Sequence, residues 1–213
     1  MHHPRHFCVH CIQSISLFPL ILILILITLV MLTFIIPSKR LSYCILVVSI
    51  VGLIVSIYAL YIENKASGND DYHASCDINE VVSCSRVFLS EQAHVFSYLG
   101  LVPKDSSLDL PNAAYGILFY ILVTIISRLM REYALLLDVL LFISTFSMVL
   151  SAYLAYVLAT MSTICVICLS TYICNFFIFF SCISCMTIKK KKVNTRVVKE
   201  IMANTKKNKN KSS

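Results

Sequence analysis

Residues 139–188 read VLLFISTFSMVLSAYLAYVLATMSTICVICLSTYICNFFIFFSCISCMTI, without one aspartate, glutamate, lysine or arginine. A bilayer core about 30 Å thick is crossed by roughly 20 mainly apolar helical residues. The run is too long for one crossing and fits two helices, with the weakly polar residues 159–163 (ATMST) as the turn. We therefore predict two membrane-spanning helices, at about 133–158 and 163–188.

Two further charge-free runs, residues 41–62 and 110–127, predict spans at about 41–62 and 112–130. Of the 213 residues 58% are hydrophobic and 14% charged, whereas an ordinary soluble domain has about 25% charged residues. We therefore predict an all-α membrane protein, a four-transmembrane-helix bundle with a luminal cysteine loop. Residues 15–36 are also apolar enough for an extra N-terminal span or an uncleaved anchor.

The net charge of +7 is unevenly distributed. From Lys189 onward the tail holds ten basic residues and one acid, whereas the loop at 63–111 holds eight acids and three basic residues. Basic residues flank the predicted spans at Lys39, Arg40, Arg128, Arg131 and 189–192. They fall on one side if the spans alternate, and basic flanks face the cytoplasm. The acidic loop then faces the endoplasmic reticulum lumen or the cell exterior, and the charge indicates no nucleic-acid partner.

Two pairs of cysteines lie on the predicted luminal side. Cys76 and Cys84 are in the loop, and Cys165 and Cys168 are at the luminal start of the last span. Thiols on an oxidising side of a membrane can pass electrons by thiol–disulfide exchange. Zinc binding by the same four sulfurs is an alternative by ligand count, but an oxidising compartment disfavours it, so we predict no metal site.

The CVIC motif at residues 165–168 is the sharpest local feature. Ser162 or Thr163 can cap a helix that begins here, and a helix N-terminus stabilises the thiolate, which is the attacking species. The alternative is an incidental CxxC in a cysteine-rich span, because free cysteine also packs well in a core. The second cysteine pair on the same side favours the redox interpretation.

Polar and aromatic residues share helix faces near these cysteines. At 100° per residue, Tyr172 lies on one narrow stripe with both CVIC cysteines. On the second span Asn112, Tyr115 and Phe119 share a face, and Asn112 either caps the helix or donates to a ligand oxygen. A dithiol, a phenol and apolar walls together suit a flat, apolar, carbonyl-bearing ligand such as a quinone.

The run YHASCDINEVVSCSRVFLS at residues 72–90 closely resembles the vitamin K epoxide reductase family of eukaryotic type, which includes a VKOR-like paralogue. The likeness continues in order through SIYAL at 56–60, Asn112 with Gly116, SAYLA at 151–155 and CVICLSTY at 165–172. It covers residues 41–186. It implies a membrane thiol oxidoreductase that reduces vitamin K 2,3-epoxide to the quinone, and the quinone to the hydroquinone.

The resemblance also implies roles for individual residues. Cys168 would act on the quinone or epoxide, and Cys165 would exchange with the loop. Cys76 and Cys84 would form a shuttle pair, with Cys84 reaching Cys165. The implied substrate-binding residues are Asn112, Tyr172, Tyr115, Phe88, Phe119 and Ser90. The first two would hydrogen-bond the oxygen-bearing ends of the ring, and the others would form its walls and cap.

The implied partner of Cys76 is a luminal thioredoxin-like oxidoreductase of the protein disulfide isomerase type. Vitamin K would be the substrate, with no tightly bound cofactor, in a multi-pass protein of the endoplasmic reticulum membrane. The predicted parts are an N-terminal extension (1–40), the catalytic four-helix domain (41–188) and a basic cytoplasmic tail (189–213). The alternatives are a quinone-dependent enzyme that generates disulfides and a non-enzymatic four-span scaffold with structural loop cysteines.

Overall fold

The computed structural model describes residues 38–211 except 70–71, 80, 105 and 131–134. Every regular element in these ranges is a helix, which confirms the all-α prediction. The predictions for residues 1–37, including the extra span or anchor at 15–36, lie outside the described residues. The elements are α2 (Ser38–Ser67), α3 (Cys84–Phe88), η1 (Glu91–Ala93), α4 (Val95–Tyr98), α5 (Asn112–Leu129), α6 (Leu135–Thr160) and α7 (Val166–Lys211).

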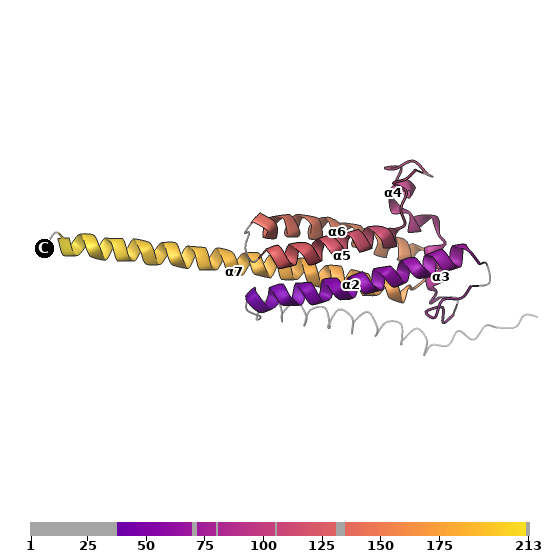
Figure 1. Ribbon diagram of the computed structural model, residues 1–213, viewed down its shortest axis with the longest axis horizontal. Coiled ribbons are helices and arrows are strands. Elements are labelled where there is room, and N and C mark those ends of the chain that lie inside the picture. Colours follow the sequence, from indigo (N-terminus) through magenta and orange to yellow (C-terminus); the bar gives the residue numbers. More distant parts are fainter. Residues whose placement is uncertain (1–37, 70–71, 80, 105, 131–134, 212–213) are drawn as a thin grey trace, which may run out of the picture.

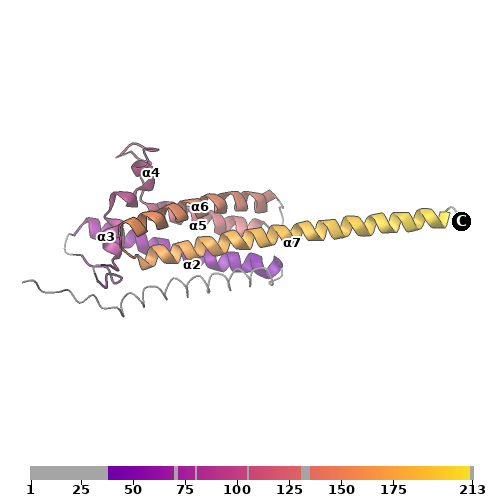
Figure 2. The same cartoon turned by 180° about the vertical axis from the view of Figure 1, so that it is seen from behind.

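Four of these helices, α2, α5, α6 and α7, are long and apolar enough to cross a membrane. They lie side by side and run in alternating directions, so the start of α2 and the extended end of α7 are at one end of the bundle (Figures 1 and 2). We call residues 68–111, which join α2 to α5, the cap. The cap covers the opposite end (Figure 1). The predicted four-span topology with one long cysteine loop is therefore confirmed.

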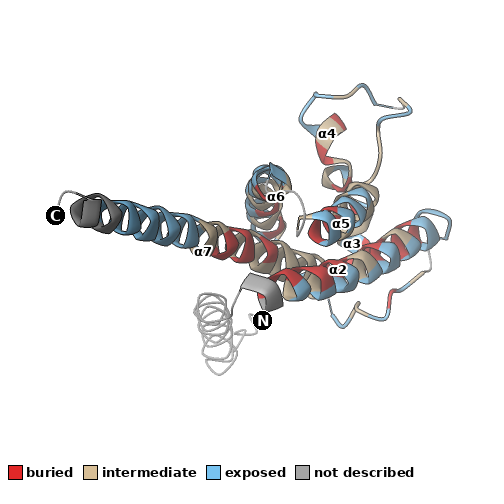
Figure 3. Cartoon of the chain, turned by 60° about the vertical axis from the view of Figure 1, so that its left-hand side comes forward, coloured by how far each residue is buried: buried red, intermediate tan, exposed pale blue. Residues whose placement is uncertain are grey.

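Two helix ends differ most from the prediction. Helix α2 continues to Ser67, so residues 63–67, which we assigned to the loop, are helical. Helix α7 continues through the lysine run to Lys211, although its apolar part ends near residue 188. Lysine is a good helix former, so a charge marks where the membrane can end rather than where the helix ends. Residues 190–205 of α7, beyond its apolar part, are exposed (Figure 3).

The bundle is held by close packing of α2 on α5 and by a polar contact across three helices. Gly52 lies directly against the Tyr120 ring, where a Cβ atom would overlap it. The Tyr120 hydroxyl donates to Asn175 Oδ1 (2.8 Å), and Asn175 Nδ2 donates to the Ser151 hydroxyl (2.8 Å). These bonds satisfy buried polar groups and fix α5, α6 and α7 relative to one another.

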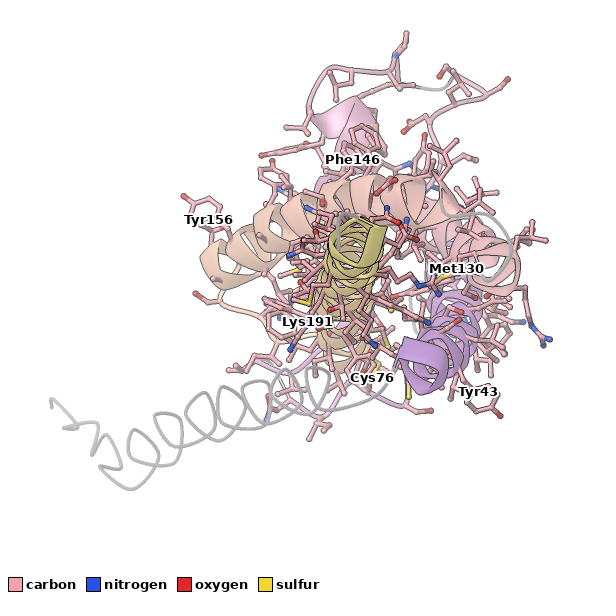
Figure 4. The ribbon with its side chains drawn as sticks, turned by 90° about the vertical axis from the view of Figure 1, so that its left-hand side faces the viewer. Tyr43, Cys76, Met130, Phe146, Tyr156 and Lys191 are labelled. Carbon is pink, nitrogen blue, oxygen red and sulfur yellow. A yellow bond between two sulfur atoms is a disulfide. The ribbon has the colours of Figure 1, made fainter. Side chains whose placement is uncertain are left out.

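The outer faces of the spans are apolar. Tyr43 on α2 and Tyr156 on α6 point away from the bundle (Figure 4), with 61% and 68% of their surfaces exposed. Large aliphatic side chains such as Ile54, Leu122 and Val149 are exposed in the same way. So much outward apolar surface is unfavourable in water and fits a lipid environment.

Candidate active site

The cap places its two cysteines in one disulfide at the end of the bundle. Cys76 and Cys84 are bonded to each other, with their Cα atoms 5.9 Å apart. Cys84 is the first residue of α3, and the preceding Ser83 caps that helix by accepting a hydrogen bond from the Arg86 backbone N–H. The Cys84 side chain is completely buried. The disulfide therefore has a half-buried partner in Cys76 and a buried one in Cys84.

A short backbone pairing brings this disulfide next to the CVIC motif. Val82 and Ile164 form a parallel bridge, in which Ser83 N donates to Ile164 O (3.1 Å) and Ile164 N donates to Val81 O (2.6 Å). Cys84 follows Ser83 on the first segment, and Cys165 follows Ile164 on the second. Both cysteines are fully buried in the same apolar cluster. The bridge thus sets the register between the two cysteine pairs.

Cys165 itself caps the N-terminus of α7. It directly precedes the helix, and its Sγ accepts a hydrogen bond from the backbone N–H of Cys168 (3.3 Å). The prediction that Ser162 or Thr163 is the cap is wrong. Ser162 lies in the turn with a φ of 51°, and the Thr163 hydroxyl donates to Met161 O.

Hydrogen bonds at the start of α7 favour the thiolate form of Cys165. The Cys168 side chain donates to the Cys165 sulfur and lowers the pKa of the Cys165 thiol, and backbone N–H groups at the start of α7 add to the effect. Burial opposes the shift without cancelling it. A lower pKa gives more thiolate, which is the species that attacks a disulfide.

A cavity of about 250 Å³ opens beside the CVIC motif, between α2, α5, α6, α7 and the cap. Its lining contains six of the ten predicted site residues. The predicted residues in the lining are Phe88, Asn112, Tyr115, Phe119, Cys168 and Tyr172. Cys165 packs next to Cys168 in the cluster that includes Tyr172.

Six of the ten predicted site residues thus line the cavity, and Gln92 lines it as well although it was not predicted. The remaining four lie around it. Cys165 is behind Cys168, the Cys76–Cys84 disulfide is in the cap, and the Ser90 hydroxyl donates to Val87 O (2.6 Å) rather than lining the cavity. The structure therefore gathers the predicted residues at one end of the bundle, while their individual roles stay predictions.

Asn112 joins the cap to α5. The Asn112 side chain is not the N-terminal helix cap of α5. Pro111 holds that position, and no side chain makes a capping hydrogen bond there. The Asn112 amide instead donates to Gln92 O (2.7 Å) and accepts from Val95 N (3.0 Å). The Asn112 nitrogen carries two hydrogens, and the Gln92 bond uses one of them. Asn112 can therefore hold the cap over the cavity and still offer a donor to a ligand.

Tyr115 is also tied to the cap. Its hydroxyl donates to Leu108 O (2.6 Å), and its ring packs edge-on against Phe96 with the ring centroids 4.6 Å apart. The Tyr115 ring lines the cavity while its hydroxyl is bonded outside it. Tyr115 thus contributes an apolar wall, as the predicted role requires.

Sequence reasoning did not place two polar residues in the site that line the cavity, Glu63 on α2 and Ser151 on α6. Glu63 was assigned to the acidic loop, although it lies on α2 and faces the cavity with Ser56 and Ala59. The spacing of these three residues could have revealed this, because positions i, i+3 and i+7 share one helix face. Ser151 and Asn175 lie deeper, where they belong to the polar contact across the bundle.

Asp77 organises the backbone around the cap disulfide. Its carboxylate accepts hydrogen bonds from Ala74 N (2.8 Å), Cys84 N (2.6 Å) and Ser85 N (3.1 Å), and from the hydroxyls of Ser83 and Ser85. Burial alone would raise the pKa of Asp77, but these hydrogen bonds outweigh it and lower the pKa to about 2. The carboxylate therefore holds the first turn of α3, and with it Cys84, in place.

We expect Asp77→Asn to loosen the cap, because asparagine loses the charge and one of the two acceptor oxygens. A loss of about 2 kcal/mol in cap closure is expected from hydrogen bonds to a charged group. This corresponds to roughly 30-fold faster modification of the buried Cys165 by a thiol reagent. Glu91→Gln, on the exposed surface of the cap, is the control. Unchanged Cys165 reactivity in Asp77→Asn would show that the carboxylate does not hold the cap.

The Asp77 carboxylate should also make opening of the cap depend on pH. The pKa of Asp77 in the folded protein is lowered from 3.8 to about 2. Its contribution to keeping the cap closed is therefore complete above about pH 4 and is lost as the pH falls through 2. Cap opening should therefore be independent of Asp77 between pH 5 and 8 and increase below pH 4. A dithiodipyridine reagent, which reacts with thiols in acid, measures this opening.

A helical membrane bundle with a dithiol beside an apolar cavity, and a second cysteine pair in register with it, defines a membrane thiol oxidoreductase. The chain belongs to the vitamin K epoxide reductase family, whose model matches residues 43–183. It is 34% identical over 119 residues to "Vitamin K epoxide reductase complex subunit 1" of Rattus norvegicus, a match that covers 55% of this chain and 70% of the rat protein. The protein of the same name from Mus musculus matches equally, with 34% identity over 119 residues.

Proposed function

We propose that this protein reduces vitamin K 2,3-epoxide to vitamin K quinone, and the quinone to the hydroquinone, in the endoplasmic reticulum membrane. The observation that carries the proposal is the meeting of two cysteine pairs beside one apolar cavity, through the Val82–Ile164 bridge. The names of the rat and mouse relatives support the choice of substrate. The catalytic part would be residues 41–188.

The proposed chemistry uses the CVIC dithiol as the reductant. Cys168, which lines the cavity, passes its thiol proton to the Cys165 sulfur that it is hydrogen-bonded to, attacks a ring carbon of the substrate and forms a C–S bond. Cys165 then attacks the Cys168 sulfur, so the Cys165–Cys168 disulfide forms and the C–S electron pair returns to the substrate. The epoxide and two thiols give the quinone, a disulfide and water. The quinone and two thiols give the hydroquinone and a disulfide.

The relay that restores the dithiol is proposed to run through the cap. The reduced Cys84 thiolate attacks the Cys165–Cys168 disulfide at Cys165, and Cys76 then resolves the mixed disulfide by bonding to Cys84. A luminal thioredoxin-like protein reduces the Cys76–Cys84 disulfide through Cys76, which is the less buried of the two sulfurs. The relay has a net flow of two electrons from the partner to the substrate.

The cavity residues are proposed to hold and polarise the ring. Asn112 and Tyr172 would hydrogen-bond its two oxygen-bearing ends, which stabilises negative charge developing on oxygen. Phe88, Tyr115 and Phe119 would supply the apolar walls, with Ser90 in the cap segment above them. Vitamin K is the substrate in this proposal, and no tightly bound cofactor is required because the cysteines carry the electrons.

Microsomes that contain the protein test the proposal. They are supplied with a small dithiol and vitamin K epoxide, and the quinone and hydroquinone are measured by chromatography. The proposal expects both products, whereas microsomes without the protein form neither above background. Turnover of the quinone without turnover of the epoxide would favour a quinone-dependent enzyme that generates disulfides. Absence of turnover with either substrate would contradict the oxidoreductase proposal.

A further inference from the structure

One acidic side chain reaches the cavity from the cap end of α2. Glu63 is only 7% exposed and lines the same cavity as Cys168, Asn112 and Tyr172. Its position on α2 places it near the cap rather than in the middle of the bundle. The relay of cysteines described above makes no use of this carboxyl group.

The two oxygens of Glu63 have different surroundings. Oε1 lies 3.7 Å from His94 Nε2 in the cap. Oε2 is buried and has no hydrogen-bond partner among the residues that the structure describes. Leaving a buried carboxyl oxygen without a partner is costly, and a native protein tolerates it mainly where a ligand or a function requires it. Because Glu63 lines the cavity, a bound ligand can supply the missing partner.

His94 connects this carboxyl group to the aqueous side. Its Nδ1 is 3.1 Å from Asp109 Oδ1, and its side chain is 38% exposed. An ionised aspartate only accepts hydrogen bonds, so Nδ1 carries the proton in this pair. In the neutral imidazole Nε2 is then the basic nitrogen, and it faces Glu63. Asp109, His94 and Glu63 thus form a line of proton-exchanging groups from the cap surface to the cavity.

We propose that Glu63 donates the proton that the substrate oxygen needs, and that His94, oriented by Asp109, restores that proton from the aqueous side. This inference rests on the proposed function, since it names the acid for the same reaction. When the Cys168 thiolate opens the epoxide, a C–S bond forms and a C–O bond breaks. The oxygen keeps the C–O electron pair and takes the proton from Glu63.

The rest of the proposed step also balances. Glu63 is left as a carboxylate and receives a proton from protonated His94, which in turn takes one from water. Attack of Cys165 on the Cys168 sulfur expels the hydroxyl group, which leaves as water with the proton that the Cys165 thiol gives up. The sum is one epoxide and two thiols converted to one quinone, one disulfide and one water. Glu63 and His94 are regenerated.

Glu63→Gln tests the inference, because glutamine keeps the size and hydrogen-bonding capacity of glutamate but cannot transfer a proton. We expect kcat for the epoxide to fall about 100-fold, the lower range of the contribution of a general acid, with little change in KM. In Glu63→Ala, which removes the carboxyl group and leaves space for a small acid, formate should restore part of the lost rate. Glu91→Gln makes the same chemical change on the exposed cap and should retain wild-type kcat.

A second variant tests the link to the aqueous side. His94→Ala should also lower kcat for the epoxide, and imidazole rather than formate should restore it. An epoxide kcat within about threefold of wild type in Glu63→Gln would overturn the inference. So would a loss that formate does not relieve and that appears in KM rather than in kcat. Failure of the proposed function is a separate result, because the wild-type protein itself would then not turn over the epoxide.

Discussion

Alanine at either cysteine of the CVIC motif is expected to abolish reduction of vitamin K epoxide by a small dithiol. Without Cys168 no thiol remains among the described lining residues to attack the substrate, and without Cys165 the C–S adduct is not resolved. Loss of such a group typically lowers kcat by about 1,000-fold or more. The measurement is quinone formation in microsomes, normalised to the amount of each variant in the membrane.

Cys174→Ala is the matched control for these variants. Cys174 is a half-buried free cysteine on the same helix, outside the cavity lining and outside the contact with the cap. We expect it to retain activity within about twofold to threefold, because a small change in packing is its main effect. Activity retained in both Cys165→Ala and Cys168→Ala would contradict the proposed mechanism.

Cys84→Ala is expected to separate the two sources of electrons. With a protein dithiol of the thioredoxin type as the only reductant, activity should fall about 100-fold, because Cys84 is the cap sulfur placed in register with Cys165. A small dithiol does not need this relay and should still support reduction. The measurement compares quinone formation with the two reductants in the same membranes.

Cys44→Ala is the control for general damage, because Cys44 lies near the start of α2, at the end of the bundle away from the cap. It should respond to both reductants as the wild type does. An equal loss with both reductants in Cys84→Ala would indicate that the cap disulfide has only a structural role.

The four spans could be predicted from the sequence because the bilayer imposes its own length on apolar helices. The turn at residues 159–163 was placed two to three residues too early, since α6 ends at Thr160 and α7 begins at Val166. The ends of α2 and α7 could not be predicted in this way. Hydropathy marks the membrane, whereas a helix continues through residues such as Lys65 or the lysines after 188 if nothing breaks it.

The site shows a similar division. Residues on regular helix faces, such as Asn112 and Tyr172, could be placed beside the cavity from spacing and family resemblance. The cap could not be built from the sequence, because its fold depends on the bridge between Val82 and Ile164 and on the bonds to Asp77. The approach of His94 to Glu63 could not be predicted either, because the two residues lie on separate segments that the fold of the cap brings together.

The most direct test of the account is to trap the exchange between the two cysteine pairs. In a Cys168→Ala variant, the Cys165 thiolate can attack the Cys76–Cys84 disulfide at Cys84, which forms the Cys84–Cys165 disulfide and releases the Cys76 thiol. No Cys168 thiol is then present to resolve this mixed disulfide, and alkylation of the Cys76 thiol blocks the reverse step. After acid quenching and alkylation, mass spectrometry of the digested protein should find the Cys84–Cys165 peptide pair. A Cys76–Cys165 pair, or only the unchanged Cys76–Cys84 disulfide, would contradict the proposed relay.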